Sequence, residues 1–237
     1  MRQRNLGVKA LLAKMMIEGD MICIFCNNSN FQFRFTKKEY FCRNFRGAMK
    51  GTMERYKKQS YCHLRMAGIL DSKLRRYFHN PNKMLNPFIR KGMTVLDFGC
   101  GPGVFSIEIA QLLELTGKVI SVDMQQGMLD IIKRKIKDTS IEKIIELHKC
   151  TQETVGLNEN VDFVLMFYVV HEVPSMENLF NEILPRVNTN GLLMIVEPKA
   201  VSKNTFDTMI NNIKEYGFEE HSLLRIAFSR GIILRKS

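Results

Sequence analysis

The strongest chemical signal in the sequence is a glycine-rich run, DFGCGPG at residues 97–103. It follows an apolar, strand-like stretch and precedes a segment whose apolar residues recur at helical spacing. Glycines at such a bend let the backbone turn tightly and approach a ligand, and the N–H groups that open the next helix attract negative charge. The run therefore predicts a ligand-binding bend between a strand and a helix.

The charge around this bend indicates which ligand it holds. A dinucleotide fingerprint, G-x-G-x-x-G, beginning with Gly99 and Gly101 requires a third glycine where the chain has Val104, which disfavours NAD. Asp97 places a carboxylate beside the ligand, which suits the ammonium and sulfonium groups of S-adenosylmethionine better than a pyrophosphate. We therefore expect S-adenosylmethionine as the cofactor.

A second carboxylate, Asp123, ends the next strand-like run. An acidic side chain at that position can accept hydrogen bonds from both hydroxyls of a ribose, and Met124 beside it can pack on an adenine. The alternative role for Asp123 is a cap for the helix predicted to follow it. The strand-end position favours ribose binding.

Four motifs in this order, DFGCGPG, VISVDM, VDFVLMFYVVHEV and NGLLMIVEPK, resemble the successive motifs of class I S-adenosylmethionine-dependent methyltransferases. The resemblance covers about residues 75 to 237 and is closest to the ubiquinone/menaquinone-biosynthesis-like (type 11) branch. It implies a methyltransferase that uses S-adenosylmethionine. Where the family usually has an Asp near the adenine, this chain has Thr151 and Gln152, which would have to substitute for it. The cofactor-binding residues implied by the resemblance are Asp97, Gly99, Cys100, Gly101, Gly103, Asp123, Met124, Thr151, Gln152 and Phe167.

The catalytic candidates follow the fourth predicted strand, where the family places groups beside the transferred methyl. They are Tyr168 and His171. Histidine is the natural base near neutral pH if the acceptor is a hydroxyl or a thiol, although His171 could equally hold a loop by hydrogen bonding. The segment lacks the Asn/Asp-Pro-Pro-aromatic signature, which disfavours methylation of exocyclic base amines. Glu197 could line the pocket, but a buried strand-end Glu held by backbone amides is the commoner outcome.

From Gly92 onward, strand-like and helix-like segments alternate, which is the pattern of a parallel sheet covered by helices on both faces. We predict strands at residues 94–98, 118–122, 144–148, 162–167 and 192–196, and helices at 104–115, 128–136, 176–187 and 205–216. The tail, with β-rich pieces around residues 227–230, predicts a closing antiparallel hairpin. The expected fold is α/β, Rossmann-like and doubly wound, with a mostly parallel seven-stranded sheet.

The N-terminal part of the chain is strongly basic. Residues 1–92 hold 20 of the 35 Lys and Arg but 5 of the 24 Asp and Glu, in a chain of net charge +11. We predict a basic extension or lid at residues 1–84, with alternating Phe31, Phe33 and Phe35 in a strand, and a methyltransferase domain at residues 85–237. The basic leader is either a solvated face or a nucleic-acid contact. We hypothesise that Arg75, Arg76 or Tyr77 lies near the pocket mouth.

Cysteines in the leader raise an alternative. Cys23, Cys26 and Cys42 have part of the spacing of a zinc ribbon within residues 21–63, with Cys62 or His63 as a possible fourth ligand. Because the set is incomplete, we predict reduced thiols and no metal. If these residues bound zinc, the chain would resemble ribosomal-RNA guanine methyltransferases, which carry an N-terminal zinc knuckle.

Composition limits the class of protein. The longest apolar run, residues 164–170, is far shorter than the roughly 20 residues of a membrane-spanning helix, and no secretion signal is evident, so we expect a soluble, cytoplasmic protein. We predict methyl transfer to a small-molecule acceptor by in-line displacement. An RNA methyltransferase and a non-catalytic cofactor-binding module are the alternatives. The sequence predicts neither the acceptor atom nor an oligomeric state.

Overall fold

The computed structural model describes residues 24–27, 30–33 and 79–237, within a chain that divides into two compact units, Met1–Gln59 and Ser60–Ser237. In the first unit, β1 (Ile24–Asn27) and β2 (Asn30–Phe33) form an antiparallel pair. The strand predicted around Phe31 and Phe33 is therefore present. Several predictions lie outside the described residues: those for Cys23, Phe35, Cys42, Cys62, His63, Arg75, Arg76 and Tyr77. The boundary at residues 84 and 85 stays a prediction.

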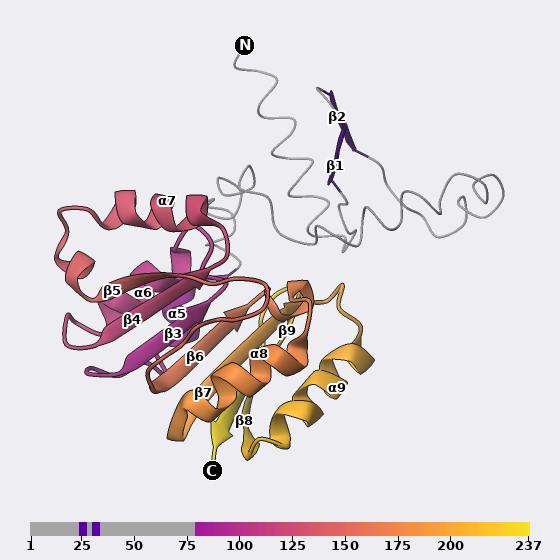
Figure 1. The fold of residues 1–237 in the computed structure, drawn as a ribbon. Coiled ribbons are helices and arrows are strands. Elements are labelled where there is room, and N and C mark those ends of the chain that lie inside the picture. The colour runs from indigo at the N-terminus through magenta and orange to yellow at the C-terminus, as the bar shows by residue number, and fades with distance from the viewer. Residues whose placement is uncertain (1–23, 28–29, 34–78) are drawn as a thin grey trace. The chain divides into compact units, whose positions relative to one another are not determined.

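The second unit is built on a seven-stranded sheet of order β5-β4-β3-β6-β7-β9-β8 (Figure 1). Its strands are β3 (Thr94–Phe98), β4 (Lys118–Asp123), β5 (Ile145–Lys149), β6 (Val161–Phe167), β7 (Val187–Pro198), β8 (Phe218–Leu224) and β9 (Ser229–Lys236). The first five run parallel, and β9 pairs antiparallel with both β7 and β8. The predicted Rossmann-like sheet and its closing hairpin are confirmed.

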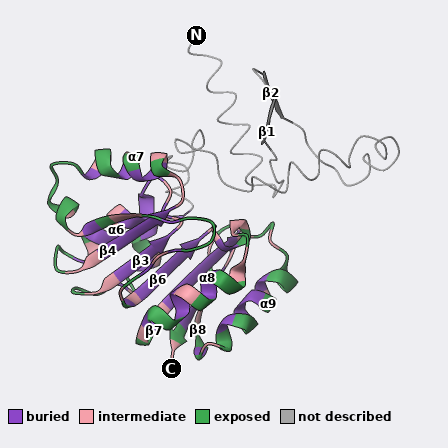
Figure 2. Ribbon diagram, in the orientation of Figure 1, coloured by how far each residue is buried: buried purple, intermediate pink, exposed green. Residues whose placement is uncertain are grey.

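Helices cover both faces of this sheet. They are α5 (Pro81–Leu85), α6 (Val104–Leu112), α7 (Gln126–Ile136), α8 (Met176–Ile183) and α9 (Lys203–Lys214), with 3-10 turns at Ser140–Lys143, Val170–Glu172 and Leu184–Arg186. Residues of α5, α6 and α7 belong to one buried apolar cluster, and residues of α8 and α9 belong to the other. Figure 2 shows the buried residues of the helices turned toward the strands. Neighbours in β3 alternate between the clusters, Val95 in one and Leu96 in the other, as the two-residue period of a strand requires.

Two helix ends differ from the predicted ones for local reasons. The helix predicted to reach residue 187 ends at Ile183, because Pro185 lacks the N–H needed to continue it and the chain tightens into a 3-10 turn before β7. The helix predicted at residues 104–115 ends at Leu112, and Glu114 and Leu115 take left-handed φ values of 49° and 65°. Both corrections lie away from the cofactor bend.

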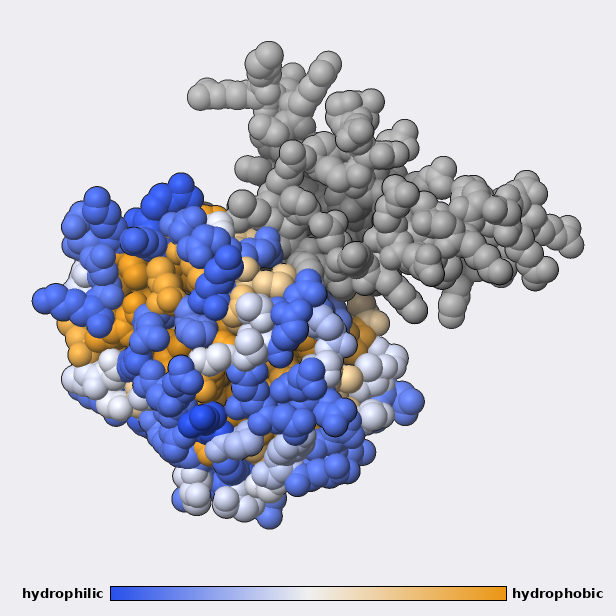
Figure 3. Space-filling view, in the orientation of Figure 1, coloured by the Kyte–Doolittle hydropathy of each residue, from blue (hydrophilic) through white to orange (hydrophobic). Residues whose placement is uncertain are grey.

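The surface of this unit is largely hydrophilic in the view of Figure 3, with apolar side chains showing between α7 and the strands beside it. No described helix combines the length and the apolar character needed to cross a bilayer. The chain connections place β4 on one side of β3 and β6 on the other. The sheet therefore has its topological switch point between β3 and β6, where open α/β sheets bind their ligands beyond the carboxyl ends of the strands.

Candidate cofactor and acceptor site

A cavity of about 300 Å³ opens at this carboxyl edge. Its volume lies at the lower end of the usual range for small-molecule pockets, roughly 300 to 1,000 Å³. The wall is formed by the last residues of the strands: Asp97 and Phe98 of β3, Asp123 of β4, Phe167 of β6 and Pro198 of β7. Of the residues predicted to bind cofactor, the wall contains Asp97, Gly99, Cys100, Gly101, Asp123, Met124, Thr151, Gln152 and Phe167, and it also contains the catalytic candidates Tyr168 and His171.

The glycine bend is shaped by its own backbone and by the protein packed against it. Gly99 and Gly101 have φ values of 73° and 52°, in the left-handed region that favours glycine. The N–H groups of Gly99 and Cys100 both donate to the carbonyl oxygen of Val122, at 2.9 and 3.0 Å, which ties the bend to β4. A Cβ at Gly99 would lie 2.4 Å from Val169 Cγ2. The bend therefore cannot carry a side chain at residue 99.

Gly103, which is also predicted to bind the cofactor, lies at the start of α6. It is the N-cap of α6, with φ 81°, and it does not belong to the cavity wall. A Cβ there would lie 2.7 Å from Ile132 Cγ1 on α7. Its role in this structure is the close approach of α6 and α7, because only a residue without a side chain fits between them.

Asp97 lies inside the wall and is bound from the following helix. Its side chain is 2% exposed, and its Oδ2 accepts a hydrogen bond of 2.5 Å from Ser106 Oγ on α6. Ser106 itself is fully buried. The bond fixes the carboxylate at the cavity and joins β3 to α6.

Asp123 holds two segments in place, the glycine bend after β3 and the start of α7. Its Oδ2 accepts from Gly101 N at 2.9 Å, and its Oδ1 accepts from Gln125 N at 2.8 Å. Burial raises the pKa of Asp123 above its ordinary value, although backbone N–H groups of Gln125, Gly101 and Met124 act in the opposite direction. Gln125 is the N-cap of α7, so Asp123 supports the start of that helix as well as facing the cavity. Each carboxylate oxygen has a second lone pair with which to accept another donor.

Two thiols stand beside these carboxylates. Cys100 and Cys150 are buried and unbridged, as predicted for reduced cysteines. Burial raises the pKa of Cys150 to about 11, and burial together with the charges of Asp97 and Asp123 raises the pKa of Cys100. Both thiols are therefore neutral at physiological pH and serve as apolar wall rather than as nucleophiles.

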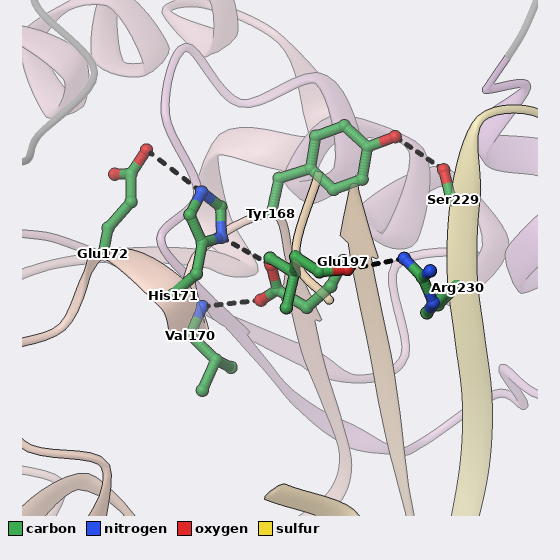
Figure 4. Close-up of polar contacts among 8 residues, drawn as sticks. Tyr168, Val170, His171, Glu172, Glu197, Ser229 and Arg230 are labelled. Atoms are coloured by element: carbon green, nitrogen blue, oxygen red, sulfur yellow. Dashed lines mark hydrogen bonds and ion pairs between the residues drawn. The ribbon is translucent and has the colours of Figure 1, made fainter. Parts of the chain in front are cut away.

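Aromatic rings form the wall at the end of β6. The Phe167 ring lies between Phe105, at a centroid distance of 4.5 Å, and Tyr168, stacked at 4.4 Å. Tyr168 takes a left-handed φ of 58°. Its hydroxyl is bonded to Ser229 Oγ at 2.5 Å and to His79 Nε2 at 3.2 Å, and it points away from His171 (Figure 4). The ring of Tyr168 thus contributes to the cavity while its hydroxyl is engaged by β9 and by the segment before α5.

His171 lies in the 3-10 turn after β6 and is paired with a buried carboxylate. Its Nδ1 is hydrogen-bonded to Glu197 Oε2, while Glu197 Oε1 accepts from the backbone N–H of Val170 at 2.9 Å (Figure 4). Glu197 is 1% exposed, whereas the His171 side chain is 34% exposed. On the other ring nitrogen, Nε2 lies 4.0 Å from Glu172 Oε1.

The surroundings of His171 act on its protonation in opposite directions. Burial lowers the pKa of His171, but the hydrogen bond and charge of Glu197 and the charge of Glu172 outweigh it, so that the pKa is raised above 6.5. Glu197 is expected from the sequence to be held by backbone amides, and its hydrogen bond from Val170 N is of this kind. The pairing with His171 is an additional contact. Sequence reasoning missed this pairing. The signal that could have revealed it is the parallel alignment of β6 with β7, in which Phe167 pairs with Val196.

Comparison with known proteins identifies the fold around this site. A family model described as a methyltransferase domain matches residues 89–228, more than half of the chain. The chain belongs to the methyltransferase domain family. The prediction of a class I S-adenosylmethionine-dependent methyltransferase with S-adenosylmethionine as cofactor is confirmed at this level.

Individual relatives match this methyltransferase domain more distantly. A demethylmenaquinone methyltransferase of Oceanobacillus iheyensis is 28% identical over 109 residues, 46% of this chain and 46% of the relative. A ribosomal protein L11 methyltransferase of Dictyoglomus turgidum is 25% identical over 137 residues, 58% of this chain and 42% of the relative. The chain thus spans about half the length of the curated relatives it matches. The solved structure of a SAM-dependent methyltransferase from Aquifex aeolicus is similar in fold, with a TM-score of 0.65 and 22% identity over 75% of this chain and 100% of that chain.

The side-chain charges around the cavity fit the cofactor of the methyltransferase family. The charged side chains in the wall are carboxylates, apart from the titratable His171: Asp97, Asp123, Glu153, Glu172 and Glu182. Among the described residues of the wall there is no Lys or Arg. Such a wall attracts a sulfonium and an ammonium group and repels a pyrophosphate, which supports the argument made from Asp97 alone.

Sequence reasoning also missed the wall on the α8 side. Ser175, Asn178 and Glu182 reach the cavity from the start and one face of α8. Glu182 accepts hydrogen bonds from Val155 N at 2.8 Å and from Thr154 Oγ1 at 2.8 Å, so it also fixes the loop after β5. Nothing in the local pattern of α8 marks these residues, because a polar helix face is equally typical of one exposed to solvent.

Proposed function

We propose that this methyltransferase domain binds S-adenosylmethionine in the cavity at the carboxyl edge and transfers its methyl group to a small-molecule acceptor held beside His171. The observation that carries the proposal is that a single cavity is lined by the glycine bend, by Asp123 and by His171, which is paired with Glu197 behind it. Cofactor-binding groups and a proton acceptor thus face the same space, as a group transfer requires.

The cofactor half of the proposal assigns a role to each predicted residue. Asp97 and the backbone of Gly99 and Gly101 surround the methionine portion, and the remaining lone pairs of Asp123 accept the ribose hydroxyls. Met124 packs on the adenine, and Thr151 and Gln152 contact its edge. Thr151 Oγ1 accepts from Glu153 N and Thr154 N at 3.2 and 3.1 Å, and its hydroxyl donates to Thr154 O over 3.5 Å, a long bond that a ring nitrogen of the adenine can replace.

The acceptor half rests on charge. A wall of carboxylates without Lys or Arg among its described residues is unfavourable for a phosphate backbone, because nucleic-acid sites neutralise phosphates with basic side chains. This supports a small molecule over RNA as the acceptor at this cavity. The name of the Oceanobacillus relative likewise indicates a small quinone-type acceptor for that protein.

The chemistry asked of the chain is alignment. The bound cofactor supplies an already activated methyl group, so the protein has to hold the acceptor in line with it and exclude water. Phe105, Phe167 and the Tyr168 ring supply the apolar, water-excluding side of the cavity. In this proposal His171, which lines the same cavity, accepts the proton that a hydroxyl or thiol loses.

The proposal is tested by calorimetry and by turnover. We expect isothermal titration to show uptake of S-adenosylmethionine and of S-adenosylhomocysteine, and we expect release of S-adenosylhomocysteine with at least one member of a panel of phenols, quinols and thiols. Uptake without release on any acceptor would favour a non-catalytic module. Preference for NAD over S-adenosylmethionine would overturn the cofactor assignment.

A further inference from the structure

Both oxygens of the Glu197 side chain have partners, and the partners differ in kind. Oε1 accepts from Val170 N, a backbone group that can only donate, and Oε2 contacts His171 Nδ1. The carboxylate is 1% exposed, so water does not replace either partner. Its backbone is fixed as well, because Glu197 is paired with Arg230 of β9 and the Arg230 guanidinium donates to the carbonyl oxygens of Lys199 and Val201 at 2.8 and 2.5 Å.

A carboxylate held in this way determines where the histidine carries its proton. An ionised carboxylate can only accept, so neutral His171 must have its proton on Nδ1 in order to donate to Glu197. The other nitrogen, Nε2, then carries the lone pair. Because the His171 ring is partly exposed and belongs to the cavity wall, Nε2 is available to a bound molecule.

We propose that Glu197 is a positioning residue that keeps the Nδ1–H tautomer of His171, and that the acceptor of this methyltransferase is consequently a hydroxyl or thiol that gives its proton to His171 Nε2. The inference rests on the proposed function for its second half only. In the transfer, the acceptor oxygen or sulfur bonds to the methyl carbon, the carbon–sulfonium bond breaks with its electron pair staying on sulfur, and the acceptor proton moves to Nε2. The imidazolium that results is adjacent to the carboxylates of Glu197 and Glu172.

The variant that isolates this role is Glu197→Gln, which keeps the shape of the side chain. Val170 N–H still requires an acceptor, so the amide oxygen takes the place of Oε1 and the amide NH₂ faces His171 Nδ1. An NH₂ group can only donate, so Nδ1 must now accept and the proton of neutral His171 moves to Nε2. The substitution thus reverses the tautomer and removes the charge that favours the imidazolium.

The measurement is the ¹⁵N and ¹³C titration of His171 by NMR in the full chain. For the wild type we expect a neutral form protonated on Nδ1 and a midpoint above 6.5. For Glu197→Gln we expect the neutral form protonated on Nε2 and a lower midpoint. The matched control is Glu172→Gln, which removes the carboxylate 4.0 Å from Nε2 but leaves Glu197, and which should lower the midpoint without changing the tautomer.

The tautomer of His171 in the wild type already tests whether the Nδ1–H form is kept, so this test does not depend on how well a variant folds. A wild-type His171 with its neutral proton on Nε2 would overturn the proposal. So would a folded Glu197→Gln chain with an unchanged tautomer and midpoint. Glu197→Asp provides a further check, because a shorter carboxylate should restore the preference for Nδ1–H at least in part.

Turnover tests the second half. Glu197→Gln should lower kcat by about 10²- to 10⁴-fold, the usual contribution of a general base, with little change in the Kd of S-adenosylmethionine. Turnover of amines but of no phenol or thiol would overturn the acceptor assignment. If the wild type takes up no S-adenosylmethionine at all, the proposed function fails, whereas the NMR result on His171 and Glu197 stands independently.

Discussion

Asp123 shows how a single side chain can support the fold and still face the cavity. Its two oxygens hold the glycine bend through Gly101 and the start of α7 through Gln125. The two roles considered from sequence, ribose ligand and helix support, therefore do not exclude each other. The carboxylate is fixed by backbone donors before any ligand arrives, and such preorganisation reduces the entropy lost on binding.

Replacing this carboxylate by an amide should weaken cofactor binding, because the charge and one of the two acceptor oxygens are lost. For Asp123→Asn we expect the Kd of S-adenosylhomocysteine to rise about 10- to 100-fold, because hydrogen bonds to a charged group contribute roughly 1.5–3 kcal/mol. Isothermal titration measures the change. Asp130→Asn on the exposed side of α7 is the control and should bind as the wild type does. Equal affinities for the two variants would exclude Asp123 from the ribose site.

The Tyr168 hydroxyl can be assigned by removing it. Because it is bonded to Ser229 and His79, we expect Tyr168→Phe to lower the free energy of unfolding by about 1 kcal/mol and to leave kcat within a few-fold of the wild type. Ser229→Ala, which removes the partner, should have a similar effect in urea denaturation. A loss of kcat beyond 100-fold with unchanged cofactor affinity would instead assign a catalytic role to Tyr168.

At the scale of elements, the contact between α6 and α7 depends on one glycine. Gly103 and Gly217 share a left-handed φ, 81° and 80°, but their surroundings differ. A Cβ at Gly103 would press on Ile132, and a Cβ at Gly217 would meet nothing within 4 Å. A substitution at Gly217 therefore tests backbone strain alone, whereas the same substitution at Gly103 tests strain together with steric crowding.

The corresponding prediction compares alanine at both sites. Gly217→Ala should cost only the left-handed conformation, about 1–2 kcal/mol. Gly103→Ala should lower the free energy of unfolding by about 1–3 kcal/mol more, because it adds overpacking against α7. Urea denaturation at matched conditions measures the difference. Equal losses would show that α7 moves aside without cost.

Helices and strands could be predicted from the sequence where the local pattern of apolar and turn residues determines them. Apolar runs bounded by turns predicted β3 at its observed limits, and the spacing of glycine and Asp predicted the bend and Asp123. The effect of Pro185 on the end of α8 was also local, but the helical pattern obscured it. His171 and Glu197 are 26 residues apart in sequence. Their contact depends on β6 and β7 being neighbours in the sheet, and local periodicity does not determine the order of the strands.

For the whole domain, the His171–Glu197 pair links protonation to stability. A histidine whose pKa is raised on folding stabilises the native state when it is protonated, so its contribution is complete below the unfolded value of 6.5 and is lost as the pH rises through the folded pKa. The free energy of unfolding of the wild type, relative to His171→Gln, should therefore be larger at about pH 6 than at about pH 9. Denaturation curves at both pH values measure it. A difference that grows with pH would contradict the raised pKa.

Methyl transfer should depend on pH in the opposite direction. A base must be neutral in order to accept a proton, so kcat should increase as the pH rises through the raised pKa of His171. The profile can be recorded with any acceptor that releases S-adenosylhomocysteine. In Glu172→Gln, which lowers the pKa, the rise should occur at a lower pH. A rate that is flat across this range would show that no such base takes part.

The acidic wall of the cavity has a consequence for release. In the proposed reaction, the methyl donor enters with a positive sulfur and leaves as an uncharged thioether, while Asp97 and the other carboxylates of the wall take no part in the transfer. An electrostatic field that favours the incoming donor no longer favours the spent nucleoside at that atom. The proposed transfer itself would thus weaken the attraction between the wall and the nucleoside and favour its release.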